Sequence, residues 1–309
     1  MDVKIDNIRP VSNEEWDNIW KRSSYVSYGS SRDFAEKWSG YTDGKVCPAA
    51  HMVVFSDGKT ALLPFSIRKH DKKYILSPAM SNAGWMSTDN IAKEHEALLA
   101  DYLTRKIENI FWVVNPFQKI SVLDKIIAKA VTCETRVLNL TDGFELIYKM
   151  WKKGSVDRKI RKALKSGVEV RIASCGEEWT EFCEVVYQDS IKRWGDNAGM
   201  VFEIEKMKDF KTPHIRLWLA LYQHKIIAGS VISYGNNVVE YWAGAALQEY
   251  FPLRPVNLLF CECIKDSCER GYAWFDFGPS LGMDGTGGEG VLAFKKSFGA
   301  TELPLYIST

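Results

Sequence analysis

The sequence predicts an α/β protein of the mixed (α+β) kind, with two domains following one another along the chain. Its 309 residues are at the upper limit for one hydrophobic core, so two domains of ordinary size are expected. Hydrophobic residues make up 46% of the chain, which is ample for two packed cores. In both halves, short apolar runs alternate with amphipathic stretches, a pattern typical of a sheet flanked by helices. We place the two domains at residues 1–140 and 141–309.

The first half opens with two helix signals. Ser12 and Glu15 form a capping box, which marks the start of a helix, and a second helix is expected to begin at Ser31. Two apolar runs, 52–55 and 60–67, are separated by turn residues and predict a hairpin. The half then continues with a helix, a buried strand, a helix and a strand, at residues 91–107, 111–114, 121–131 and 136–140.

The second half contains longer strands. An apolar stripe of Ile160, Ala163 and Leu164 predicts a helix that begins near Ser155 and stops at Gly167. A further helix has Pro255 in its first turn and Gly271 just past its end. Helices are expected at residues 143–151, 155–166, 177–193 and 255–270, and strands at 168–172, 214–222, 225–234, 238–244 and 273–277.

The composition excludes several classes of protein. A net charge of +1 predicts no general affinity for nucleic acid, so any basic function must be local. No apolar run reaches the length of about 18 residues that a spanning helix needs, so no membrane insertion is expected. The N-terminus lacks an apolar signal region, which favours a cytoplasmic protein. The seven scattered cysteines lack zinc-site spacing, so we expect reduced core cysteines, no metal and no permanently bound cofactor.

Residues 149–171 carry nine Lys or Arg and only two acidic residues. Arg158, Arg161 and Lys162 lie off the apolar stripe of the predicted helix and are therefore candidates for binding a phosphate or a nucleic acid. The alternative is a solvated helix face, which is what most charge runs are. The local excess of positive charge in a nearly neutral protein favours binding.

The last forty residues suggest a site that closes on a ligand. A strand ends in Asp276, a glycine-rich loop spans residues 279–290, and Lys295 and Lys296 follow on a short element. Asp276 is the first candidate for a catalytic carboxylate, and Glu240, in the strand 238–244, is the second. The alternatives are a carboxylate that only bonds loop N–H groups, an exposed strand charge and a surface lysine. No Gly-Lys-Ser/Thr follows the loop, so it is not a P-loop.

Several segments resemble FemAB-like proteins of the GNAT acyltransferase superfamily. The sequence RKIRKALKSGVEV, from Arg158 to Val170, is similar to one block of that family, and FKKSFGA, from Phe294 to Ala300, is similar to its closing block. The order and spacing of the blocks agree between Lys149 and Ala300. The remaining similar segments are PVNLL at 255–259, CERGY at 268–272, FDFG at 275–278, SRDF at 31–34 and DGKTALLP at 57–64.

The resemblance implies two tandem GNAT-like domains and the transfer of an acyl or aminoacyl group to an amine. It implies that Lys295, or alternatively Lys296, stabilises the negative charge that develops at the acyl carbon. It also implies that Arg193 lies near a phosphate of the acceptor. The co-substrate is expected to be acyl-CoA or aminoacyl-tRNA, which makes tRNA a candidate partner beside a small anionic amine acceptor.

The donor is the least determined part of this interpretation. Arg254 and Asn257 stand at the start of a predicted helix, where free N–H groups favour an anion. The glycine-rich turn that a typical acetyl-CoA-using GNAT has here is missing. Three functions therefore stay open: a FemAB-like N-acyltransferase with a nucleotide- or saccharide-linked acceptor, for example of the cell envelope; an acyl-CoA N-acetyltransferase with a non-standard CoA site; and a non-catalytic module that binds an anion or RNA. The oligomeric state is left open.

Overall fold

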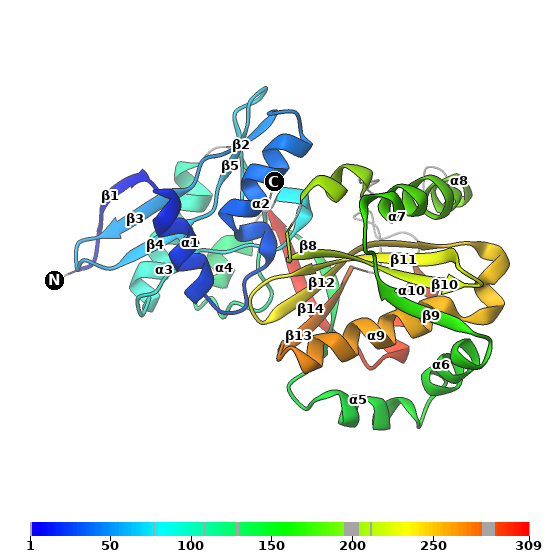
Figure 1. The fold of residues 1–309 in the computed structure, drawn as a ribbon. Coiled ribbons are helices and arrows are strands. Elements are labelled where there is room, and N and C mark those ends of the chain that lie inside the picture. The colour runs from blue at the N-terminus through cyan, green and yellow to red at the C-terminus, as the bar shows by residue number, and fades with distance from the viewer. Residues whose placement is uncertain are drawn as a thin grey trace. The chain divides into compact units, whose positions relative to one another are not determined.

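The computed structural model describes residues 2–76, 78–107, 109–127, 130–194, 204–210, 212–279 and 288–308. Its contacts form two compact units, one of Met1–Glu134 with Pro304–Thr309 and one of Thr135–Leu303 (Figure 1). Each unit combines helices with sheet, which confirms the predicted fold class. The domains 1–140 and 141–309 stay a prediction. In the described part of the chain, no helix has both the length and the apolar character needed to cross a membrane.

The first unit holds two small sheets. One has the order β1 (Ile5–Pro10), β3 (His51–Phe55), β4 (Thr60–Leu63). The other includes β2 (Val46–Pro48), β5 (Ser66–Arg68), β6 (Lys73–Ile75) and β7 (Ile110–Val113), and Ile307 of β14 (Thr301–Ser308) pairs with Val113. The Ser12–Glu15 capping box is present at α1. The helical elements of this unit are α1 (Asn13–Arg22), η1 (Tyr28–Ser30), α2 (Arg32–Tyr41), η2 (Pro78–Met80), α3 (Lys93–Asp101), η3 (Tyr102–Lys106) and α4 (Leu123–Ile127).

The second unit is built on a larger sheet. Its strand order is β8 (Val131–Asn139), β13 (Trp274–Pro279), β12 (Val238–Ala246), β11 (Lys225–Tyr234), β10 (Ile215–Tyr222) and β9 (Val168–Ile172). Neighbours are antiparallel except β12 and β13, which are parallel. A parallel pair needs a crossover, and α9 (Pro255–Glu269) provides it. This connection places two strand segments 36 residues apart in sequence side by side.

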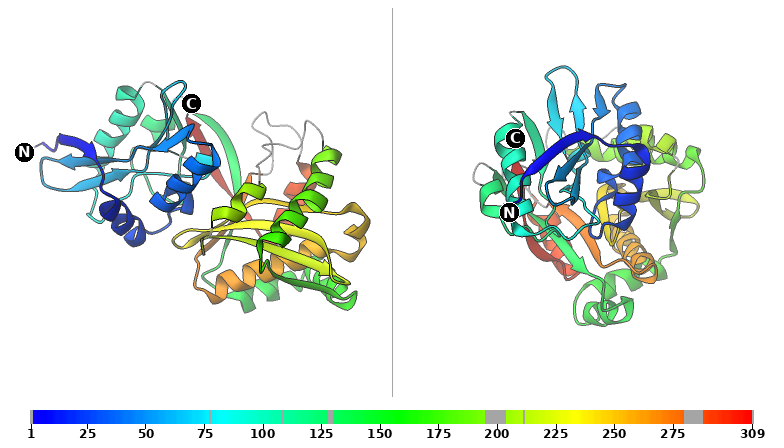
Figure 2. Two further views of the ribbon diagram at one scale, coloured as in Figure 1. Left: turned by 45° about the horizontal axis from the view of Figure 1, so that its top comes forward. Right: turned by 90° about the vertical axis from the view of Figure 1, so that its left-hand side faces the viewer.

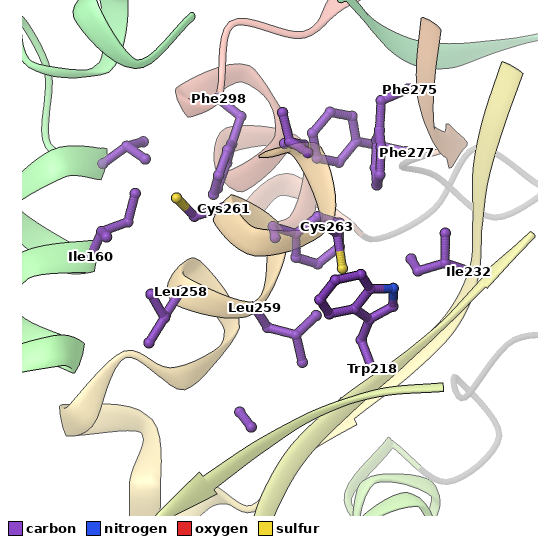
Figure 3. Packing of buried hydrophobic residues seen from close by; sticks show 14 of the residues in the cluster. Ile160, Trp218, Ile232, Leu258, Leu259, Cys261, Cys263, Phe275, Phe277 and Phe298 are labelled. Atoms are coloured by element: carbon purple, nitrogen blue, oxygen red, sulfur yellow. The ribbon is translucent and has the colours of Figure 1, made fainter. Parts of the chain in front are cut away.

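Helices cover both faces of this sheet. Helices α5 (Phe144–Trp151), α6 (Val156–Lys165) and α9 lie on one face, while α7 (Gly176–Glu181) and α8 (Gln188–Trp194) lie on the other (Figures 1 and 2). The main core lies on the α9 face, where Leu258 and Cys261 pack with Ile160, Phe277 and Phe298 (Figure 3). The remaining helical elements are η4 (Phe182–Tyr187), η6 (Ile204–Phe210), η7 (Gln248–Leu253) and α10 (Glu289–Ser297).

Because side chains alternate along β13, Asp276 lies on the face of the sheet opposite α9. Phe275 and Phe277 belong to the α9-face core, so Asp276 between them points the other way. On that other face η4 packs closely against the sheet: a Cβ at Gly229 would lie 2.7 Å from a ring carbon of Phe182. The sheet therefore separates an apolar core from a face that carries buried polar groups.

Some sequence-based expectations were wrong. Leu164 is 55% exposed, because the buried stripe of α6 runs through Val156, Ile160 and Ala163. Ser155 makes no side-chain cap there, although Gly167 does adopt the left-handed conformation, with φ +83°. The predicted helix 121–131 is only Leu123–Ile127, and the β-branched pair at 131 and 132 already belongs to β8. The short strands β1, β2 and β6 were not anticipated.

Candidate active site

The central feature of the second unit is a pair of buried carboxylates on neighbouring strands. Glu240 of β12 and Asp276 of β13 are partners in the parallel register, and each is 5% exposed. Register partners in a sheet project from the same face about 5 Å apart, so the two side chains are neighbours. Burial, together with the charge of Asp276, raises the pKa of Glu240 to about 8. Burial likewise raises the pKa of Asp276. The pair is thus suited to hold and exchange a proton near neutral pH.

Asp276 is held in place by two donors. Thr135 of β8 donates its hydroxyl hydrogen to Asp276 Oδ1, and the backbone N–H of Gly278 donates to the same oxygen at 2.7 Å. Gly278 has φ +72°, a conformation that favours glycine and that turns the chain back toward the carboxylate. These bonds oppose the effect of burial on the Asp276 pKa. The carboxylate therefore also has the structural role that was the alternative in the sequence analysis.

Lys295 lies at the same end of β13. Its Nζ donates to the carbonyl oxygens of Gly278 and Pro279 at 2.8 and 2.7 Å, and the residue is 4% exposed. Phe298, the residue just after α10, packs in the core three positions along from Lys295, so Lys295 faces inward as well. Burial lowers the pKa of Lys295 to about 8, against the opposing effect of Asp276. Lys296 is exposed, so only Lys295 of the two candidates lies beside Asp276.

Thr135 and Arg136 are functional candidates that the sequence reasoning missed. Thr135 is 1% exposed, and Arg136 is 5% exposed and pairs with Glu302 at 2.8 Å. Both lie on β8, which is hydrogen-bonded to β13, and the charge of Arg136 contributes to lowering the pKa of Lys295. Thr135 lies just before the strand expected at residues 136–140, and no local pattern singles it out; only the strand pairing shows which carboxylate it meets.

Arg193 is engaged by protein groups. It donates to Asp189 Oδ2 at 3.0 Å, to Ser190 Oγ at 2.8 Å and to the carbonyl oxygen of Ala246 at 2.7 Å. Its guanidinium also lies over the ring of Phe251, 5.3 Å from the centroid. These contacts tie α8 to the end of β12 and to η7. In these contacts Arg193 acts as a cation at the end of a helix, and its role toward the substrate stays a prediction.

The start of α9 has features of an anion site. Arg254, the residue before the helix, is exposed and has φ 63° and ψ 40°, the left-handed conformation usually taken by glycine. Asn257, in the first turn, is 6% exposed, and its Nδ2 has no hydrogen-bond partner among the residues that the structure describes. A buried amide without a partner is costly, so a ligand that accepts this hydrogen bond would be favoured.

The structure does not bring the basic residues of α6 to the carboxylates. Arg158, Arg161 and Lys162 are exposed, and α6 lies on the α9 face of the sheet, opposite Glu240 and Asp276 (Figure 1). Arg161 pairs with the buried carboxylate of Asp157 at 2.5 Å. Of the predicted glycine-rich loop, residues 280–287 lie outside the described residues.

We expect the stability of the protein to depend on the protonation of Glu240. Its folded pKa of about 8 lies above the ordinary 4.5, so between these values the folded state holds a proton that the unfolded state lacks. Stability should therefore fall as pH rises through this window, by up to about 1.4 kcal/mol per pH unit. Urea unfolding at pH 5.5 and 7.5 should show a smaller pH dependence for Glu240→Gln than for wild type. Glu169→Gln, which changes an exposed carboxylate, is the control, and an unchanged dependence in Glu240→Gln would contradict the assignment.

Part of the second unit matches a known family model. Residues 152–296 match the family model of the acetyltransferase (GNAT) domain. The range includes Glu240, Asp276 and Lys295. A comparison with curated protein sequences found no significant match. The family model supports an acyltransferase and leaves the donor open.

Solved structures with similar folds cover nearly the whole chain. FemX is 14% identical with a TM-score of 0.72, covering 97% of this chain and 96% of its own. The C-terminal domain of a protein assigned as a lysylphosphatidylglycerol synthetase from Agrobacterium fabrum is 14% identical with a TM-score of 0.57, covering 96% and 92%. A tandem GNAT protein from the clavulanic acid biosynthesis pathway is 12% identical with a TM-score of 0.50, covering 98% of each chain. These similarities confirm the predicted tandem GNAT-like architecture.

Proposed function

We propose that this chain, an acyltransferase of the GNAT superfamily with a FemAB-like fold, transfers an acyl or aminoacyl group to the amine of an anionic acceptor. The observation that carries the proposal is the buried Glu240–Asp276 pair, in register on parallel strands, with the Lys295 ammonium at the end of the same strand. Burying three ionisable groups together is costly for a purely structural purpose.

The reaction requires a proton acceptor. An amine must be neutral to attack the carbonyl carbon of an ester or thioester. It loses a proton as the amide forms, while the acyl C–O or C–S bond breaks and the donor leaves as its hydroxyl or thiol. In our proposal the Glu240–Asp276 pair accepts that proton, with Glu240 as the proton-carrying member because its pKa is about 8. Asp276, fixed by Thr135 and Gly278, positions the pair and raises the basicity of Glu240. This ranking reverses the order of the two candidates in the sequence analysis.

Lys295 is proposed to stabilise the oxyanion. An ammonium has three donors, and two of them bond the carbonyl oxygens of Gly278 and Pro279. The third can donate to the oxygen that becomes negative when the amine adds to the acyl carbon. A preorganised charge in a desolvated site is worth far more than the same charge in water. The carbonyl contacts preorganise Lys295 for this role.

The donor is proposed to bind at the start of α9. Both acyl-CoA and aminoacyl-tRNA carry phosphates, and free N–H groups at a helix start favour an anion. The left-handed Arg254 and the buried Asn257 amide support such a site. A second candidate function, an acyl-CoA-dependent N-acetyltransferase, is favoured by one observation: Arg254 adopts the glycine-like conformation even though the usual glycine-rich turn is missing from the sequence.

The acceptor is proposed to be nucleotide- or saccharide-linked, as in precursors of the cell envelope. Arg193, on the face of the sheet that also carries the carboxylates, is the residue proposed to lie near its charge. Its side chain is 24% exposed and already pairs with Asp189. We therefore expect it to donate hydrogen bonds at the edge of the acceptor site rather than to act as an unpaired cation. The co-substrate is released in each cycle, and no permanently bound cofactor is part of the proposal.

A thermal-shift screen tests the donor. A ligand at about a hundred times its Kd stabilises the native state by about 2.7 kcal/mol, which should raise the melting temperature by several degrees. We expect a shift with either acyl-CoA or aminoacyl-tRNA, and a reduced shift in Asn257→Leu, which removes the amide donor while keeping the size. CoA without an acyl group and uncharged tRNA are the matched ligands. A protein that shifts with none of the four would contradict the proposal.

A further inference from the structure

Helices α5 and α6 expose large apolar side chains among basic ones. Leu146, Met150 and Leu164 are 57%, 44% and 55% exposed. On the same helices and the turn between them, the exposed basic residues are Lys149, Lys152, Lys153, Arg158, Arg161, Lys162 and Lys165. We call the nine residues Leu146, Lys149, Met150, Lys153, Arg158, Arg161, Lys162, Leu164 and Lys165 the α5–α6 surface.

Two of the exposed apolar residues lie outside the buried stripes of their helices. In α5, Ile147 and Trp151 are buried and Leu146 and Lys149 are exposed, whereas Met150 is 44% exposed and its terminal methyl group lies beside Gly299 of the same unit. In α6, Ile160 and Ala163 are buried and Leu164 is turned outward. Leu146 and Leu164 thus leave an exposed apolar side chain on each helix among exposed basic residues, a combination that marks an interaction surface rather than packing within the unit.

The two helices form one layer. Tyr148 of α5 donates its hydroxyl hydrogen to Asp157 of α6 at 2.9 Å, and Asp157 pairs in turn with Arg161. Both helices belong to the layer that also contains α9, on one face of the sheet (Figures 1 and 2). Their outer sides therefore belong to the same side of the unit, away from the sheet.

This pair of helices carries a net positive charge. Residues 145–165 contain eight Lys or Arg and two acidic residues, a net charge of 8 − 2 = +6, in a chain whose total is +1. One of the two acids, Asp157, is buried and already paired with Arg161. The surface thus presents cations that have few anionic neighbours of their own.

We propose that the α5–α6 surface attaches the protein to an anionic lipid surface. Lysine and arginine side chains reach the negatively charged headgroups, while Leu146, Met150 and Leu164 enter the boundary between headgroups and acyl chains. This combination of basic and apolar residues on the exposed side of amphipathic helices is typical of interfacial binding. It leaves the opposite face of the sheet, with Glu240 and Asp276, free for catalysis.

The apolar residues favour a lipid surface over a nucleic acid. A nucleic acid would bind the cations through its phosphates but would offer no partner to three exposed aliphatic side chains. An interfacial membrane site uses both kinds of residue. The inference does not depend on the proposed reaction, because no residue of the carboxylate site takes part in it.

Vesicle sedimentation tests the proposal. The full chain is mixed with phosphatidylcholine vesicles that contain about one-third phosphatidylserine, or none, near 0.1 M salt. We expect binding to the anionic vesicles only. The charge variant Lys149→Gln, Lys153→Gln, Lys165→Gln should bind at least about tenfold more weakly, since each basic residue contributes roughly fivefold. Its control is Lys69→Gln, Lys72→Gln, Lys93→Gln, which removes three exposed lysines from the first unit and should bind as wild type.

A second variant separates lipid from nucleic acid. Leu146→Ser with Leu164→Ser keeps every charge, and we expect several-fold weaker binding to the anionic vesicles but no change in binding to a structured RNA. Val185→Ser, an exposed valine of η4 on the other face of the sheet, is the control. Melting temperatures verify that each variant is folded. The proposal is overturned if wild type does not sediment with anionic vesicles, if the serine variant binds them as wild type, or if RNA binds more tightly than the vesicles do.

Discussion

Replacing Glu240 with glutamine will lower the rate of acyl transfer by about two to four orders of magnitude and leave the protein folded. Glutamine has nearly the same shape but cannot accept the proton that the attacking amine loses. The substitution also removes a carboxyl group that is 5% exposed and whose charged form is disfavoured by burial, so the fold should tolerate it. The measurement is the initial rate of amide formation, followed by mass spectrometry, with the donor that shifts the melting temperature.

Two further variants make this result interpretable. Glu169→Gln removes an exposed carboxylate from β9 of the same sheet and should keep the wild-type rate. Asp276→Asn keeps an acceptor oxygen for the Gly278 N–H and should lower the rate by lowering the basicity of Glu240. If Glu240→Gln retains a rate within about threefold of wild type, Glu240 does not accept the proton.

Replacing Lys295 with methionine should have the second largest effect, a loss of about a hundredfold to a thousandfold in kcat with little change in KM. The donor would bind as before, but the charge that stabilises the oxyanion would be gone. Methionine fills a similar volume, and the loss of two hydrogen bonds is offset in part by the removal of a buried cation. Steady-state kinetics give both constants, and urea unfolding gives the change in stability.

Lys296→Met is the matched comparison for Lys295. It changes the neighbouring residue of α10, which is exposed rather than 4% exposed, so we expect a much smaller loss of kcat. Equal losses in the two variants would indicate a general effect of charge near the site. A larger loss in Lys296→Met would transfer the oxyanion role to that residue.

Much of the second unit follows from the sequence. Residues 225–234 form β11 as expected, because a long apolar run bounded by turn residues leaves few other structures. Pro255 in the first turn and Gly271 past the end locate α9 within a residue. Asp276 and Lys295 were predicted as site residues from the order of strand, loop and closing motif; both are buried in the same part of the unit, and their catalytic roles stay a prediction.

The contacts that define the site could not be read from local patterns. Thr135 and Asp276 are 141 residues apart, and they meet only because β8 pairs with β13. Glu240 and Asp276 are register partners only because α9 returns the chain parallel to β12. Leu164 faces outward because the buried stripe of α6 runs through Ile160 and Ala163. The spacing of residues 160, 163 and 164 alone does not decide whether Leu164 belongs to that stripe.

The pH dependence of the transfer rate tests whether Glu240 accepts the proton and Lys295 stabilises the oxyanion. If Glu240 is the base, the rate rises with pH as its carboxyl, with a pKa of about 8, loses its proton. If the Lys295 ammonium stabilises the oxyanion, the rate falls as that group, also with a pKa of about 8, deprotonates. We therefore predict a narrow maximum near pH 8 for wild type, with apparent pKa values that belong to the coupled groups, and the loss of the rising limb in Glu240→Gln. A rising limb that persists unchanged in Glu240→Gln would contradict this prediction.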